Sequence, residues 1–272
     1  KLAAGPQARP DQIIKLTQEY GLDRPLPEQY VRYISNLFQG NWGYSISNKR
    51  DVFHDLVTYF TATLELTLVS TLIGLVVGIP LAIISARWRD RWPDHAARFV
   101  SIGAVSVPVF WIAIILQIVL AQNLHWLPVS GRFDPRANYP TTHTGLLLID
   151  TLLAGNIPAF FTALRYIIMP AFCQSLLVIA LITRQLRGDL LDILRKDFVL
   201  VARANGIPER RIWTRYLMKN ALIATISQLG FLIGFQLGGA VLIEYVLDWP
   251  GIGQYALKAA LLLDFQPIMG AT

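Results

Sequence analysis

The sequence is poor in charged side chains, in cysteine and in nucleotide-binding motifs. Only 15% of its 272 residues are Asp, Glu, Lys or Arg, against roughly a quarter in an ordinary soluble domain. Its single cysteine, Cys173, excludes an internal disulfide framework and a cysteine-based metal cluster. The phosphate-loop pattern Gly-x-x-x-x-Gly-Lys-Ser/Thr is absent, so the sequence lacks the usual means of holding ATP. Its four histidines lie far apart and match no metal-ligand spacing.

Long apolar runs take the place of charge. Four stretches contain no Asp, Glu, Lys or Arg: 66–86, 99–121, 166–183 and 221–243. A helix needs about 20 apolar residues to cross the hydrocarbon core of a bilayer, where unpaired backbone groups are too costly. The sequence therefore predicts an all-α fold, a polytopic helical membrane protein with spans at about 60–86, 99–121, 166–186 and 220–246.

The positive side chains indicate the orientation of these spans. Residues 87–98 carry four Arg, and residues 184–219 carry nine Lys and Arg, of 24 in the whole chain. Short loops rich in Lys and Arg remain in the cytoplasm. We therefore expect 1–58, 122–165 and the tail from 247 to lie outside. Because the basic excess follows the topology, the net charge of +6 requires no nucleic-acid partner.

The predicted organisation is an external N-terminal helical segment, 1–58, and a transmembrane domain, 59–272, with a cytoplasmic loop at 184–219. In the first segment, 11–20 and 27–38 are typical of short amphipathic helices. Since both ends of the chain are then external, we expect a preceding and a following span that these 272 residues do not include. The apolar stretch 146–153 is too short to span, which favours an interfacial or re-entrant piece.

Small residues repeat every fourth position in the first and fourth spans, which predicts close helix packing. They are Ser70, Gly74 and Gly78, and then Gly230, Gly234 and Gly238. Pro80, Pro108 and Pro170 are expected to kink or bound their helices, as membrane helices tolerate.

The cytoplasmic loop 184–219 is predicted to be structured. A polar helix continues the third span, a short helix follows Asp197, Gly206 is placed to end it, and Pro208 to begin the next. Val199, Ala202 and Gly206 align nearly on one side. The pattern fits a docking knob for a soluble partner, and it fits a solvated basic loop equally well.

The run Asp197-Phe-Val-Leu-Val-Ala-Arg-Ala-Asn-Gly206 resembles the cytoplasmic loop of ABC importer permeases, in the Ala-Arg-Ala-x-Gly form of the peptide/dipeptide/nickel group. Leu200 stands where the wider family has Glu, and Lys219 where it has Pro. Six further fragments are similar to this group in the same order, closest to the B-type subunit of dipeptide and oligopeptide importers. They are Gly21-Leu-Asp-Arg-Pro-Leu-Pro-Glu-Gln-Tyr30, Gly40-Asn-Trp-Gly-Tyr-Ser45, Ser106-Val-Pro-Val-Phe-Trp111, Leu127-Pro-Val-Ser-Gly131, Gly238-Gly-Ala-Val-Leu-Ile-Glu244 and Trp249-Pro-Gly-Ile-Gly253.

The resemblance implies a type I ABC importer permease fold of six spans in a bacterial inner membrane. It implies a second, homologous permease subunit, two ATP-binding subunits and an extracytoplasmic substrate-binding protein. The chain itself would be no enzyme and hold no cofactor, because ATP and Mg belong to the partners. Its cargo would be short peptides, or nickel complexes, opines or glutathione. The resemblance also implies which residues couple to the ATPase: Phe198, Ala202, Arg203, Ala204, Gly206, Arg210 and Arg211. Among them, the small residues Ala202 and Gly206 would let the ATPase approach closely.

Uncharged polar side chains inside the spans are candidates for the translocation path, because they can bond a passing peptide without trapping it. They are Gln117, Gln174, Ser175, Gln228 and Gln236. Bonding between helices explains each of them equally well. An ion-coupled transporter or channel would keep ionisable groups at membrane depth, whereas Glu65 and Glu244 lie only at span ends. An intramembrane hydrolase would need a nucleophile with its base, and none is visible.

Overall fold

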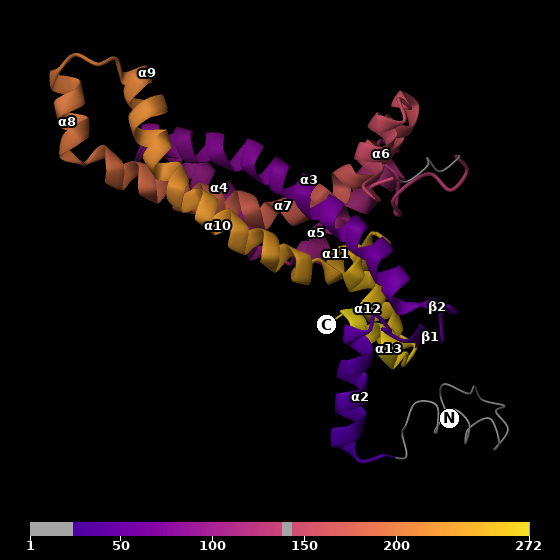
Figure 1. Ribbon diagram of the computed structural model, residues 1–272. Helices are drawn as coiled ribbons and strands as arrows, with labels where there is room; N and C mark the ends of the chain where they lie inside the picture. Colours follow the sequence, from indigo (N-terminus) through magenta and orange to yellow (C-terminus); the bar gives the residue numbers. More distant parts are fainter. Residues whose placement is uncertain (1–23, 138–142, 272) are drawn as a thin grey trace.

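The computed structural model describes residues 24–137 and 143–271, which are predominantly helical (Figure 1). This confirms the predicted all-α fold class. The only strands in the described ranges, β1 (Tyr44–Ser45) and β2 (Arg50–Asp51), form a small antiparallel hairpin. The helices are α2 (Leu26–Phe38), α3 (Val52–Arg87), α4 (Trp92–Ser106), α5 (Val109–Leu116), α6 (Leu147–Leu153), α7 (Ile157–Leu194), α8 (Asp197–Ala204), α9 (Glu209–Arg211), α10 (Met218–Gly239), α11 (Val241–Val246), α12 (Ile252–Leu261) and α13 (Phe265–Ala271).

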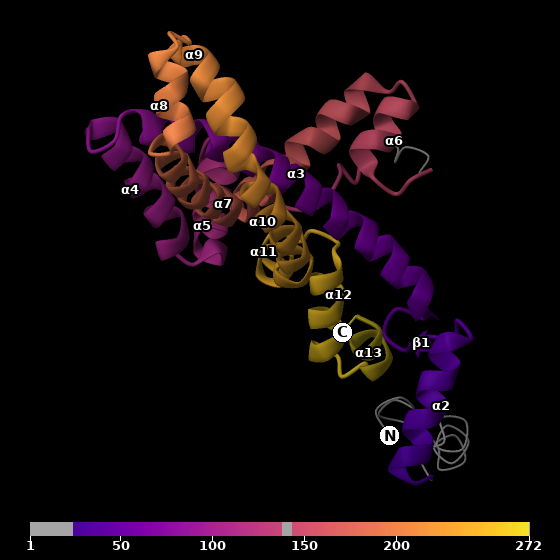
Figure 2. The same ribbon diagram turned by 60° about the vertical axis from the view of Figure 1, so that its left-hand side comes forward.

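Two long helices, α3 and α7, lie side by side and form the axis of the molecule (Figures 1 and 2). They contain 36 and 38 residues, so at 1.5 Å per residue each is roughly 55 Å long, well beyond a hydrocarbon core of about 30 Å. In the most apolar stretch of 18 residues in each helix, 67% of the α7 stretch is buried. The corresponding share is 33% for α3 and 22% for the helix Glu209–Gly238. Most of the apolar surface of the outer helices is therefore left uncovered by the described residues.

Three of the four expected spans are single long helices, whereas the second is bent. Trp92–Ser106 and Val109–Asn123 meet at 97°. Val107 is extended, with φ −104° and ψ 133°, because a residue that precedes proline avoids the helical region, and Pro108 begins α5. The expected kink or helix boundary at Pro108 is thus confirmed in the span predicted over 99–121. In the span expected over 220–246, α10 ends at Gly239 and α11 follows.

The first set of small residues packs as expected, but the second set does not pack within the described part of the chain. A Cβ atom on Gly74 would lie 2.5 Å from Val178 Cβ on α7, and one on Gly78 3.4 Å from the Ile179 carbonyl oxygen. A Cβ atom on Gly230, Gly234 or Gly238 would meet no described atom within 4 Å. Close approach of α3 to α7 thus depends on glycine at 74.

Replacing Gly74 with alanine is expected to destabilise the subunit by about 1–3 kcal/mol, as overpacking does in a filled interior. The added methyl group would collide with the branched Val178 side chain and push α3 from α7. A lower thermal midpoint (Tm) of the purified complex in detergent would show this. Gly230→Ala is the matched control, since its methyl group meets open space. Equal midpoints for the two variants would contradict the packing argument.

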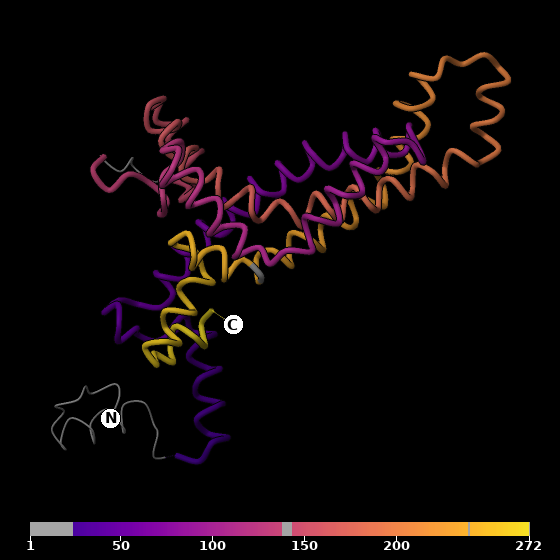
Figure 3. Tube along the Cα trace, turned by 180° about the vertical axis from the view of Figure 1, so that it is seen from behind, coloured from indigo at the N-terminus to yellow at the C-terminus, as the bar shows by residue number. Residues whose placement is uncertain are grey.

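The two ends of the long helices carry different structures (Figure 3). At one end α8 and α9 form the predicted elbow, with the basic segment 87–98 beside it, because Ala82 and Ala86 of α3 pack against Val199 and Ala202 of α8. At the other end lie α2, the hairpin, α12 and α13. Both basic segments therefore share one end. Helix α2 confirms the helix expected over 27–38, and the helix expected over 11–20 lies outside the described residues.

Candidate functional site

The elbow is a helix, a tight turn and a helix, as the sequence predicted. Helix α8 ends in a Schellman motif, in which Gly206 N–H donates to Arg203 O at 3.0 Å and Ile207 N–H to Ala202 O at 3.1 Å. Gly206 has φ +71°, in the left-handed region that glycine adopts at little cost. Pro208 precedes α9. The chain then returns towards the bilayer through a π-helical segment, Ile212–Leu217, and α10.

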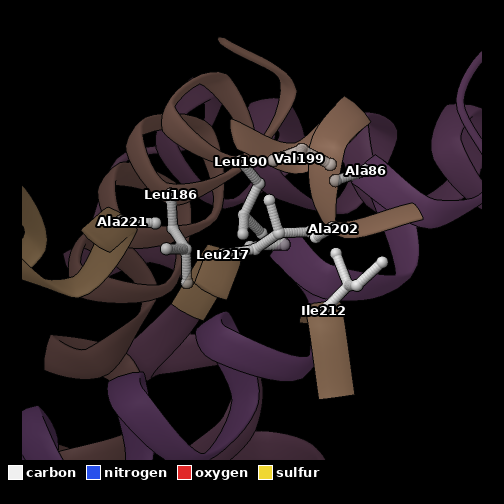
Figure 4. Packing of buried hydrophobic residues seen from close by; sticks show 9 residues of the cluster. Ala86, Leu186, Leu190, Val199, Ala202, Ile212, Leu217 and Ala221 are labelled. Carbon is white, nitrogen blue, oxygen red and sulfur yellow. The ribbon is translucent and has the colours of Figure 1, made fainter. Parts of the chain in front are cut away.

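A buried apolar cluster joins the elbow to the ends of three spans (Figure 4). It takes side chains from α3, α7, α8, the π-helical segment and α10: Ala82, Ala86, Leu186, Leu190, Val199, Ala202, Ile212, Leu217 and Ala221. Seven of these nine are 0–1% exposed. Because close-packed interiors transmit displacement rather than absorb it, a force on α8 must reach α3, α7 and α10.

The predicted coupling residues lie on two faces of α8, in the turn after it and on α9. Ala202 is 4% exposed and packs inside the elbow, so the expectation that it offers close approach to a partner needs correction: it supports the helix from within. Phe198 is 42% exposed, and Ala204, Gly206, Arg210 and Arg211 are also exposed. Sequence reasoning missed Leu200 and Val201, which are 70% and 56% exposed. The three-residue spacing of Phe198, Val201 and Ala204 was the available signal.

The elbow arginines differ in their partners. Arg203 Nε donates to Glu209 Oε1 at 2.7 Å, across the turn. Arg210 and Arg211 are exposed and form no ion pair with any residue that the structure describes. Both are therefore free to meet acidic side chains of a partner. Arg87 of α3 lies over the Trp213 ring at 5.7 Å, which adds a contact between the span and the elbow.

One buried carboxylate, at the start of α4, connects that helix to α3 and α7 near the base of the elbow. Asp94 is fully buried and accepts hydrogen bonds from Ser85 of α3, from Arg98, and from Arg187 Nη2 of α7 at 2.8 Å. The Asp90 backbone N–H adds a bond at 3.0 Å. Charge-assisted hydrogen bonds of this kind are the strong ones. The basic end of the bundle is therefore held together by specific polar contacts as well as by the apolar cluster.

Two of the five predicted path residues meet between α3, α7 and α10. Gln174 and Gln236 are 5% and 3% exposed, and Gln174 Nε2 donates to the Gln236 carbonyl oxygen at 3.5 Å. Ser70 Oγ donates to Gln236 Oε1 at 2.7 Å, whereas Gln174 Oε1 has no hydrogen-bond partner among the residues that the structure describes. Both glutamines line a cavity of about 310 Å³ that also touches Pro108 at the bend.

The other three path candidates do not line this cavity. Gln117 Nε2 donates to the carbonyl oxygens of Val129 at 2.9 Å and Val246 at 3.2 Å, which ties the π-helical segment Gln117–Asn123 to the outer loop and to α11. Ser175 is fully buried, and its hydroxyl bonds its own helix. Gln228 is half-buried on α10. The hydrogen bonds of Gln117 and Ser175 thus hold the fold together, and bonding within the protein explains why these two side chains are polar.

The carboxylates at the span ends are both engaged in structural contacts. Glu65 pairs with Arg132 Nη2 at 2.5 Å and accepts the Leu148 N–H at 2.6 Å. Glu244 is fully buried, accepts the Thr63 hydroxyl at 2.7 Å and the Gln254 N–H at 3.0 Å, and so caps the first turn of α12. Neither carboxylate is left free to carry an ion, as an ion-coupled transporter would require.

The glycines of the 249–253 fragment allow the chain to wrap closely around Glu244. A Cβ atom on Gly253 would lie 2.7 Å from Val241 Cα and 2.9 Å from Glu244 Oε2. Trp249 is 1% exposed and donates its indole N–H to the Ala62 carbonyl oxygen at 3.0 Å. The fragment therefore fastens the end of the fourth span to α3.

Asp150 orders the outer loop in a similar way. It is fully buried in α6 and accepts bonds from the Thr144 N–H at 2.9 Å, the Thr144 hydroxyl at 2.8 Å and the Gly145 N–H at 3.0 Å. Burial alone would raise the pKa of Asp150, but these hydrogen bonds to the charged form hold the pKa below its usual value. The stretch expected to be interfacial or re-entrant is thus a short helix, α6, held by a charged cap.

Residues 24–137 and 143–271 contain no group of three or more His, Cys, Asp or Glu side chains placed to hold a metal ion. Helices α3, α7 and Glu209–Gly238 are long and apolar enough to cross a membrane, and the bent pair makes up to four spans.

Comparison with known proteins gives consistent results. Residues 78–272 match the family described as binding-protein-dependent transport system inner membrane component. The chain is 41% identical over 270 residues to the probable D,D-dipeptide transport system permease protein DdpB of Escherichia coli K12, covering 99% of this chain and 79% of that protein. It is 38% identical over 245 residues to the di/tripeptide transport system permease protein DppB of Pseudomonas aeruginosa UCBPP-PA14, covering 90% and 73%. It is 30% identical over 268 residues to the glutathione transport system permease protein GsiC of Escherichia coli O1:K1, covering 98% and 78%.

Proposed function

Because the chain belongs to the family of inner membrane components of binding-protein-dependent transport systems, we propose that it is a permease subunit that imports short peptides. The names of its relatives support this cargo: one transports D,D-dipeptides, one di- and tripeptides, and one glutathione, itself a small peptide. Nickel complexes and opines are the remaining alternatives for the cargo. As a permease the chain is no enzyme, and ATP is hydrolysed by other subunits.

The elbow is the proposed contact with the ATPase. One observation carries this proposal: the inner face of α8 is packed onto three spans, while its outer face exposes Phe198, Leu200 and Val201. Large apolar side chains gathered on a surface mark an interaction site. A partner bound to this face would move the spans when it changes conformation. Such a movement at an interface can switch a transporter between two states. Arg210 and Arg211 would add charge complementarity to an acidic rim.

The proposed assembly contains this chain, a second homologous permease subunit, two ATP-binding subunits that hold ATP and Mg, and an extracytoplasmic substrate-binding protein. In it, residues 1–58 form an external segment and 59–272 the transmembrane domain with the loop 184–219. The cargo passes beside Gln174 and Gln236, because these two side chains alone of the five candidates line a cavity at the bend. Gln174 Oε1 is buried and has no hydrogen-bond partner in the described ranges, so in this proposal it is the acceptor for a peptide N–H.

Uptake by the complete importer in liposomes tests the function. Labelled dipeptide should enter only with internal ATP and external binding protein, and a protonophore should leave the initial rate unchanged. Nickel salts serve as the comparison cargo. Uptake driven by a proton gradient without ATP would contradict ATP-driven import. Uptake of nickel but not of dipeptide would contradict the proposal that the cargo is a short peptide.

A further inference from the structure

A second cavity, of about 220 Å³, lies between α4 and α7 at the basic end of the bundle. It is distinct from the cavity beside Gln174, since the two share only Val105 among their lining residues. Its lining divides by chemistry. Arg98, Arg184 and Arg187 supply guanidinium groups, whereas Ile102 and Leu181 belong to an apolar wall.

The charges around this cavity do not balance. Arg98 and Arg187 share the buried carboxylate of Asp94, and Arg98 also pairs with Asp90 at 3.2 Å. Arg184 is exposed and makes no ion pair with any residue in the described ranges. Three arginine side chains therefore face two carboxylates. The one without a carboxylate partner, Arg184, lies at the polar part of the cavity. An anion at that point would be attracted without displacing an existing partner.

The order of the lining residues along the helices is the one that a membrane interface requires. On α4, Arg98 lies one turn nearer the basic end than Ile102, and on α7, Arg184 lies one turn nearer it than Ala180. Ile102 and Val105 are 63% and 52% exposed, so the apolar wall opens sideways. The cavity thus presents cations at headgroup level and an apolar wall at acyl-chain level.

We propose that this cavity binds an anionic phospholipid of the cytoplasmic leaflet. Its phosphate lies at Arg184, and an acyl chain lies along Ile102 and Val105. Basic pockets between spans on the cytoplasmic side recognise anionic headgroups in this way. A free phosphate would use the guanidinium groups alone and leave the apolar wall uncovered, so the lining favours the lipid. The proposal depends on the membrane orientation and not on the peptide cargo.

Native mass spectrometry of the complete importer in detergent tests the site. The probes are dioleoyl phosphatidylglycerol, dioleoyl phosphatidylethanolamine and inorganic phosphate, each titrated separately. Phosphatidylglycerol should be retained in preference to phosphatidylethanolamine, and Arg184→Gln should weaken its retention about fivefold, the effect of one basic residue at a membrane surface. Arg195→Gln is the matched control: it removes the same charge from an exposed residue that follows α7 and lies outside the cavity.

A second variant tests the cavity without changing charge. Ala180 is 6% exposed and lines the apolar wall, so Ala180→Leu should fill the space and reduce phosphatidylglycerol retention. Losses in Arg184→Gln and Ala180→Leu, but not in Arg195→Gln, support the site. The site would be overturned if the two lipids were retained equally, or if either cavity variant retained phosphatidylglycerol as well as the unmodified protein does. Displacement of phosphatidylglycerol by equimolar inorganic phosphate would also overturn it. Peptide uptake in liposomes is measured separately, so failure of the lipid site leaves the proposed function standing.

Discussion

Replacing Gly206 with valine is expected to reduce peptide uptake and binding-protein-stimulated ATPase activity at least tenfold, while the subunit still inserts into the membrane. A Cβ atom at this position meets no described atom within 4 Å, so the effect is not a collision. It comes from φ +71°, a region that costs an ordinary L-residue roughly 1–2 kcal/mol and a β-branched residue more. Valine would move the backbone away and break both bonds of the Schellman motif.

The loss of these bonds would turn α8 relative to the spans. Ile207, whose N–H bonds Ala202, packs against the cluster that contains Val199 and Ala202. When Ile207 shifts, the exposed face with Phe198 and Leu200 no longer meets a partner at the same angle. Uptake by membrane vesicles, ATPase activity of the purified complex and the amount of subunit in the membrane are the three measurements.

Gly206→Asn separates a backbone effect from a contact effect. Asparagine tolerates the left-handed region, so this variant should keep most of the transport activity. If asparagine and valine were equally harmful, the glycine would act by close approach to a partner rather than by its φ angle. Full activity of the valine variant would contradict any coupling role for the turn.

The elbow shows how far the sequence carries the site. Gly206 and Pro208 are local signals, and the turn lies where they predict it. The alignment of Val199 and Ala202 correctly indicated one face of a helix. It did not show that this face points inward, because its partners Ala86 and Ile212 belong to other segments of the chain. The outward face could be identified only once these segments were brought together.

The spans show the same limit. Their lengths follow from hydropathy, and three of them are single helices. The sequence predicted a kink or a helix boundary at Pro80, Pro108 and Pro170 alike. The chain bends by 97° at Pro108, whereas α3 and α7 continue through Pro80 and Pro170. Whether a proline breaks a span depends on whether neighbouring helices keep the freed backbone groups satisfied. That is a property of the packing and cannot be read from local sequence.

Contacts between distant residues were also hidden, and the pair of Glu65 and Arg132 is the clearest case. The side chains are 5% and 9% exposed and 67 residues apart. Arg132 also donates to the Gly145 carbonyl oxygen at 2.7 Å and lies over the Trp249 ring at 5.8 Å. One arginine thus joins α3, the outer loop and the segment before α12.

Arg132→Gln is accordingly expected to lower the free energy of unfolding by about 3–5 kcal/mol, because it leaves the buried Glu65 charge without its partner. Unfolding of the purified subunit by sodium dodecyl sulfate in mixed micelles measures this. Arg136→Gln, an exposed arginine four residues further along the same loop, is the control and should change little.

The double variant Glu65→Gln/Arg132→Gln shows whether the loss comes from the unpaired charge. Removing both charges should restore part of the stability, since an uncharged pair no longer buries an isolated carboxylate. Glu65→Gln alone should be the milder single change, because its amide oxygen still accepts the Leu148 N–H, while Arg132 keeps its bond to the Gly145 carbonyl. If the double variant were as unstable as the sum of the two single variants, the pair would contribute nothing as a pair, and the outer loop would be held to α3 by packing alone.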